Sequence, residues 1–229
     1  MVVLTLLLLA TLMVVDPKLM PPFLEEALGL GPNGHVLAAG SGNYQFERVQ
    51  PGTHDMPVTY DSCQTLHYVI NFDGAPAAFR DGAFIRDAVR EISQVSGLRF
   101  RYDGTSDLNY RTRNYQSGPI LFSFDELPQA ALYDRAVAMG GSTTPARAGR
   151  QVYSTGAVTF RRSSFEAIAG RLGGEEEAKA IALHEIGHVL GLAHVQDTNE
   201  IMYPSEGHTT DLGPGDRTGL RILGSGPCY

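Results

Sequence analysis

Residues 184–194, with the sequence HEIGHVLGLAH, decide the architecture expected of this chain. His184 and His188 are four positions apart, so on a helix their side chains lie one turn apart on the same face. A helix is expected from about Glu175 to Leu190, and its opening run of glutamates suits the exposed N–H groups of a first turn. Gly191 is expected to end this helix, because glycine readily adopts the left-handed conformation that a sharp reversal of the chain needs.

Three histidines of this stretch can bind one metal ion. His184 and His188 present their imidazoles from neighbouring turns, and His194 can return to the same point after the reversal. Three neutral nitrogen ligands with a fourth position left for water is the plan of a catalytic zinc site, whereas structural sites use four protein ligands. Glu185 lies beside the ligands but is angled away from the ion, so it can accept a proton from a zinc-bound water. We therefore predict one catalytic Zn²⁺ ion, with Glu185 as the general base.

The motif resembles the signature of the metzincin metalloproteases. Met202 follows His194 by eight residues in the sequence IMYP, and it resembles the Met-turn that lies beneath the zinc in that clan. Spacing from the third histidine to Pro204 is nearest to that of the matrixins. The resemblance implies that Gly191 and Met202 support the site structurally. Beyond the Met-turn, the chain resembles the C-terminal matrixin helix that packs behind it. The likeness rests on Leu212, Asp216, Gly219, Leu220 and Leu223.

The sequence also departs from the matrixin pattern. It has no matrixin pro-segment with a zinc-blocking cysteine, and no loop rich in His and Asp to bind structural zinc and calcium. The likeness is specific over about residues 175–224 and only architectural over 44–174. Tyr203 directly follows the Met, whereas the extra tyrosine ligand of astacins lies two residues after it. We therefore interpret Tyr203 as a structural or pocket-wall residue, in a compact relative of the matrixins.

Upstream of the metal motif, the chain alternates between extended and helical patterns. Leu66–Phe72 alternates and is rich in β-branched and aromatic residues, which predicts a strand. Ala83–Val95 has apolar residues at helical spacing and is followed by Gly97, which predicts an amphipathic helix. Further extended segments are expected at Leu98–Tyr102, Pro119–Phe124, Ala136–Gly141 and Gln151–Phe160, with a surface loop over residues 104–118.

This order of elements predicts an α/β (α+β) fold with a mostly parallel sheet covered by helices. The resemblance to metzincins sharpens the expectation to a twisted five-stranded sheet with one antiparallel edge strand, a zinc-binding helix, a Met-turn and a C-terminal helix. By the same analogy, Ala136–Gly141 is the candidate edge strand. An extended peptide substrate would pair along it through main-chain hydrogen bonds.

The N-terminal region differs in composition from the rest of the chain. Residues 1–15 are apolar apart from two threonines, and as a helix they would span roughly 22 Å, short of the ~30 Å hydrocarbon core of a bilayer. This length favours a secretory signal peptide, with a retained membrane anchor as the alternative. Residues 16–43 contain several prolines and glycines and are interpreted as a linker or short pro-segment. The catalytic domain is expected to comprise residues 44–229.

Cys63 and Cys228 are the only cysteines, and in an exported protein an even number suggests a disulfide; two unpaired thiols are the alternative. A net charge of −7 argues against nucleic acid as a partner. The residues and the resemblance together predict a secreted, monomeric zinc metalloendopeptidase that acts on proteins or peptides. The alternative is a catalytically inactive zinc-binding module anchored at the cell envelope. His67 and His208 are given no role in either interpretation.

Overall fold

The computed structural model describes residues 30–31, 35–36, 43–127, 136–144, 150–205 and 209–228. Residues 1–15, most of the 16–43 segment and His208 lie outside these ranges, so the expectations for them stay predictions. Within the described part of the chain, no helix is long and apolar enough to cross a membrane.

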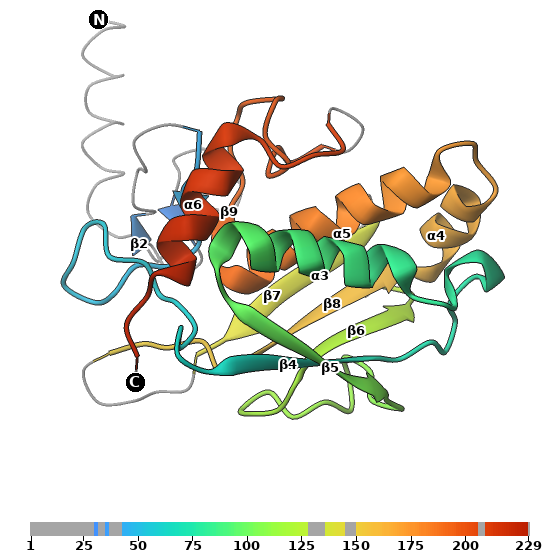
Figure 1. The fold of residues 1–229 in the computed structure, drawn as a ribbon, viewed down its shortest axis with the longest axis horizontal. Coiled ribbons are helices and arrows are strands. Elements are labelled where there is room, and N and C mark those ends of the chain that lie inside the picture. Colours follow the sequence, from blue (N-terminus) through green and yellow to red (C-terminus); the bar gives the residue numbers. More distant parts are fainter. Residues whose placement is uncertain are drawn as a thin grey trace, which may run out of the picture.

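A five-stranded sheet forms one layer of the fold (Figure 1), and its strand order is β5-β4-β6-β8-β7. The strands are β4 (Thr65–Ile70), β5 (Arg99–Thr105), β6 (Ile120–Asp125), β7 (Ala138–Thr143) and β8 (Thr155–Arg161). Neighbouring strands run parallel except for β7, which is antiparallel to β8 and lies at one edge. The predicted fold class is therefore confirmed, including the single antiparallel edge strand.

Helices α3 (Ala83–Ser96) and α5 (Gly174–Leu190) lie side by side over one face of this sheet (Figure 1). The apolar spacing in α3 places its large residues on the face that is turned to the core, and Phe84, Ile85 and Ile92 are almost fully buried. Aromatic rings fill the space between the layers, with Phe160 and Phe165 only 4.7 Å apart between ring centres. The sheet and these two helices thus form a single hydrophobic core beneath the metal motif.

Both long helices begin and end close to where the sequence predicts. The helix expected at Ala83–Val95 extends by one residue, and Gly97 follows it at φ 78°. The helix that carries the histidines ends at Leu190, as expected. The C-terminal helix inferred from the matrixin resemblance is α6 (Pro214–Gly224), with Leu220 and Leu223 buried.

The sequence patterns missed several short elements. Helix α4 (Arg162–Ala169) directly follows β8, and a 3₁₀ turn spans Ala77–Phe79. Two-residue strands form two antiparallel pairs: β1 (Leu30–Gly31) with β2 (His35–Val36), and β3 (Gln45–Phe46) with β9 (Leu192–Ala193). Such strands are too short to produce a periodic pattern. The β3–β9 pair is nevertheless important, because β9 lies inside the metal motif.

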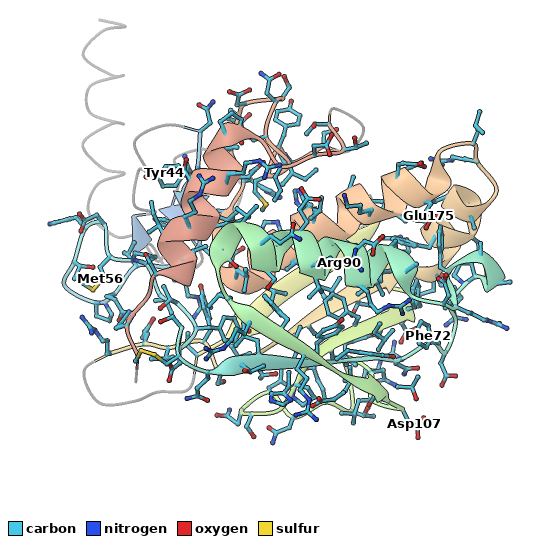
Figure 2. The ribbon with its side chains drawn as sticks, in the orientation of Figure 1. Tyr44, Met56, Phe72, Arg90, Asp107 and Glu175 are labelled. Atoms are coloured by element: carbon cyan, nitrogen blue, oxygen red, sulfur yellow. A yellow bond between two sulfur atoms is a disulfide. The ribbon has the colours of Figure 1, made fainter. Side chains whose placement is uncertain are left out.

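Cys63 and Cys228 form a disulfide, with their Cα atoms 5.3 Å apart (Figure 2). The bond joins the approach to β4 with the tail that follows α6. Beside it, the Ser62 hydroxyl donates a hydrogen bond of 2.5 Å to the carbonyl of Gly226. The C-terminal tail is therefore attached to the start of the sheet by a covalent and a polar contact.

Candidate metal centre

The three motif histidines meet at one point. Each Nε2 atom of His184, His188 and His194 lies 3.1 Å from each of the other two. The Nδ1 atom of His184 lies 2.7 Å from the carbonyl oxygen of Ile201, and that of His188 lies 2.9 Å from the carbonyl of Leu192. A carbonyl can only accept, so both rings carry their proton on Nδ1 and leave the Nε2 lone pair free. Nitrogen lone pairs facing one another at this distance repel, unless a cation lies between them.

This donor set fits zinc. Ligand nitrogens bound at 2.0–2.1 Å and separated by tetrahedral angles lie roughly 3.3 Å apart, close to the 3.1 Å seen among these atoms. Three imidazoles leave a fourth position for water or substrate, as in catalytic zinc sites. The structure therefore brings together all three predicted ligands, in an arrangement that could hold one metal ion.

The surroundings of the rings favour neutral imidazoles at two of the three positions. Burial, together with the two neighbouring histidines, holds the pKa of His184 well below its usual value. Burial and the nearby His188 lower the pKa of His194 to about 4. At His188 burial also lowers the pKa, but contact with Glu47 and the charge of Glu185 outweigh it, so the pKa is raised. Neutral nitrogen is the form that binds metal.

Gly191 turns the chain from the second ligand toward the third. Its φ of 114° lies in the left-handed region, and its N–H donates to the carbonyls of Gly187 and His188. A side chain here would also press on Tyr153, whose ring atoms lie 3.0 Å from the Cβ position. Helix α5 thus ends at Gly191, where the chain takes the left-handed conformation that a reversal needs.

Met202 lies beneath the ligand helix and is buried, with 1% of its surface exposed. A Cβ atom on Gly187 would lie 2.5 Å from the Met202 sulfur, so the small residue makes room for the methionine. The Met202 carbonyl accepts a hydrogen bond from the N–H of Val195, directly after the third ligand. The turn also supplies the Ile201 carbonyl that orients His184. Met202 is therefore buried in a turn whose backbone contacts both His184 and Val195.

Behind this turn lie two buried carboxyl groups, those of Asp216 and Glu200, and the sequence patterns pointed only to Asp216. Asp216 accepts hydrogen bonds from the N–H groups of Ile201, Met202 and Gly213. Glu200 accepts two more from the N–H groups at the start of α6, those of Gly215 and Asp216. Both acids are 1% exposed. Asp216 was expected in the C-terminal helix, whereas nothing in the local sequence distinguished Glu200 from a surface residue.

Glu185 lies on the side of the ligand helix that packs against the edge strand, and 7% of its surface is exposed. Gly140 of β7 packs directly on it: a Cβ atom there would lie 2.4 Å from the Glu185 carbonyl oxygen and 2.8 Å from Oε2. Among the described residues, no strand pairs with the outer side of β7. A carboxylate, three nitrogens that could hold a metal ion and a strand edge that no described strand covers therefore lie in the same region.

A helix with two histidines, a reversal to a third and a buried methionine turn define the metzincin class of zinc peptidases. The family model described as matrixin matches residues 38–223, which is most of the chain, and the chain therefore belongs to the matrixin family. This membership supports a zinc metalloprotease function in general terms.

Comparison with solved structures gives a more distant likeness. The crystal structure of archaemetzincin from Methanopyrus kandleri is 16% identical, with a TM-score of 0.46, and the match covers 71% of this chain and 96% of that chain. No curated protein sequence matches the chain significantly.

Proposed function

We propose that this chain is a zinc-dependent endopeptidase that hydrolyses peptide bonds in proteins, with Glu185 as the general base. The observation that supports this most directly is the cluster of three Nε2 atoms, each 3.1 Å from the others, with Glu185 on the same helix. Matrixin membership favours zinc as the ion and a peptide as the substrate.

In this proposal, His184, His188 and His194 hold the ion through their Nε2 atoms. The chemistry that zinc supplies when bound is a lowered pKa for a water ligand and positive charge to balance an oxyanion. Glu185 accepts the proton of the attacking water and then passes it to the leaving amine. Its position beside Gly140 keeps this carboxylate next to the strand edge along which the peptide would lie.

The substrate would extend along the outer edge of β7. An extended peptide would continue the sheet there through main-chain hydrogen bonds, and these bonds do not depend on its sequence. Side-chain preference would then come from the pocket beside the metal, to which Tyr203 is a candidate contributor. The candidate edge strand expected at Ala136–Gly141 overlaps β7 (Ala138–Thr143), which is the edge strand that this arrangement needs.

The rival function is an inactive zinc-binding module. Metal binding alone requires neither Glu185 nor a glycine packed against it, since neither supplies a ligand nitrogen. The presence of both next to the histidine cluster favours the enzyme.

Export is part of the proposal and has separate support. The apolar residues 1–15 suit a signal peptide, and the Cys63–Cys228 disulfide suits an oxidising compartment. N-terminal sequencing of the mature protein would distinguish a removed signal from a retained anchor. Size-exclusion chromatography would test the expected monomer.

The first test compares the full-length protein with its Glu185→Ala variant on a peptide library. We expect cleavage by the parent that a chelator abolishes and added zinc restores. Loss of the general base should lower kcat/KM by about 10²–10⁴-fold. Zinc content should be equal in the two proteins, because Glu185 is not a proposed ligand. Equal cleavage by both, or no cleavage by a zinc-loaded parent, would rule out the proposed function.

A further inference from the structure

Glu47 lies beside one of the three histidines, although it is far away in the sequence. Its Oε1 atom is 3.0 Å from Nδ1 of His188, the ring atom on the opposite side from the histidine cluster. The same Nδ1 is 2.9 Å from the carbonyl oxygen of Leu192, so its one N–H is shared between a carbonyl and a carboxylate. The His188 side chain is 12% exposed and that of Glu47 is 36% exposed. The contact is therefore partly shielded from water.

A short backbone ladder holds Glu47 in this position. Strand β3 pairs with β9 in the register Gln45↔Ala193 and Phe46↔Leu192, and the N–H of Glu47 then donates to the carbonyl of Gly191 at 2.9 Å. Strand β9 connects the second ligand to the third. Residues 45–47 are thus attached to the turn that brings His188 and His194 together.

Packing on α6 fixes the same segment from its other side. Figure 2 shows Tyr44 beside this helix, and a Cβ atom on Gly219 would lie 3.2 Å from that of Tyr44. Asn43 donates a hydrogen bond of 2.5 Å to the carboxylate of Asp197, three residues after the third ligand. The position of Glu47 therefore depends on the fold around the metal centre and not on its own flexible side chain alone.

Two of the three histidines are oriented by different partners. The Nδ1–H of His184 points to the carbonyl of Ile201, whereas that of His188 meets a carboxylate in addition to its carbonyl. A carboxylate makes a ring more basic than a carbonyl does, and a more basic ring binds a metal ion more strongly.

We propose that Glu47 is a positioning residue of the metal centre, which accepts the Nδ1–H of His188 and strengthens zinc binding by the three histidines. The proposal rests on the zinc centre described under the proposed function. Glu47 acts through His188 and does not touch the substrate. Partners of this kind typically account for a 10–100-fold difference in metal affinity.

The test measures the zinc dissociation constant of the full-length protein by competition with a chromophoric chelator. Glu47→Ala should weaken binding 10–100-fold, and Glu47→Gln, which keeps an oxygen acceptor without the charge, should recover part of the loss. Gln45→Ala is the matched control, because Gln45 lies in the neighbouring strand β3 and makes no hydrogen bond or ion pair with His188. Its zinc affinity should equal that of the parent.

A second measurement separates positioning from folding. The metal-free forms of the parent and of the three variants should unfold at nearly the same denaturant concentration, so that the difference appears in zinc binding alone. A Glu47→Ala affinity within about a factor of two of the parent would overturn the role of Glu47 and leave the zinc centre intact. So would an equal loss in Gln45→Ala, which would indicate a general loosening of the strand. A parent that binds no zinc would overturn both proposals.

Discussion

At the scale of single residues, Gly140 of β7 packs directly against Glu185 of α5. A methyl group on Gly140 would lie 2.4 Å from the Glu185 backbone oxygen, so Gly140→Ala must push β7 away from the helix. We expect kcat/KM to fall by about 10–100-fold, because displacing a catalytic group by about 1 Å can cost this much. The measurement is peptide cleavage by zinc-loaded protein.

The adjacent glycine provides the control for this substitution. A Cβ atom on Gly141 meets nothing within 4 Å, so Gly141→Ala should leave cleavage nearly unchanged. If the two alanine variants cleave equally well, the contact between Gly140 and Glu185 does not matter for activity. Zinc content should match the parent in both.

The sequence predicted those residues of the site whose geometry is local. His184, His188 and Glu185 are related by one turn of helix, and Gly191 and His194 follow within a few residues. Glu47 and Gly140 could not be found in this way, because only the folded sheet and the β3–β9 pair bring them to the centre. A glutamate in a polar stretch and a glycine in a short strand carry no local sequence signal that would link them to a metal centre.

At the scale of elements, the carboxyl pair Glu200 and Asp216 joins the Met-turn to α6. Burial raises the pKa of Asp216 to about 7, and the charge of Glu200 adds to this, although hydrogen bonds from Ile201 and Gly213 oppose it. In the unfolded chain the same carboxyl has its ordinary pKa of 3.8. Between these values the folded protein binds more protons than the unfolded one, so stability falls as the pH rises.

This difference predicts a pH dependence that belongs to the pair of carboxyls that Asp216 forms with Glu200. The contribution of Asp216 is fully present below about pH 4 and is lost as the pH rises through about 7, at no more than about 1.4 kcal/mol per pH unit. Asp216→Asn cannot titrate, so its free energy of unfolding should fall less than that of the parent over this range. Denaturant unfolding with chelator present measures both. Parallel curves for the two proteins would contradict the prediction.

Element boundaries followed from the sequence where the apolar pattern was long. Helix α3 has apolar residues over four turns and a glycine at its end, and it was predicted to within one residue. Helix α4 was missed because its eight residues give only two turns, directly after a strand. Strands β3 and β9 have two residues each, and their pairing depends on contacts far apart in the chain.

At the scale of the whole molecule, the Cys63–Cys228 disulfide closes a loop over a sequence separation of 165 residues. Linking positions so far apart restricts the unfolded chain and can contribute up to about 5 kcal/mol to stability in the chain-entropy model. We expect a reducing agent to lower the denaturant midpoint of the metal-free protein. The Cys63→Ser/Cys228→Ser double variant should begin at the lower value and not respond to the reducing agent. A parent that does not respond would contradict the prediction.

Strand order could not be derived from the sequence patterns alone. The mostly parallel sheet follows from alternating strands and helices. The strand order β5-β4-β6-β8-β7, in which β5 and β6 lie on opposite sides of β4, does not follow from it. The antiparallel direction of β7 came from the metzincin resemblance. Hydrophobic patterns indicate which face of a strand is buried, whereas they carry little information on which strands become neighbours.

No strand among the described residues pairs with the outer edge of β7, so its backbone groups could pair with an extended chain, including the same strand of another molecule. Two of its six residues are glycines, which lower the tendency of a strand to pair. Pairing between two such edges would gain few side-chain contacts. A peptide that also reached the metal would gain a further anchor. The composition of this strand would therefore limit self-association at high protein concentration, while leaving the edge open to a peptide that passes through.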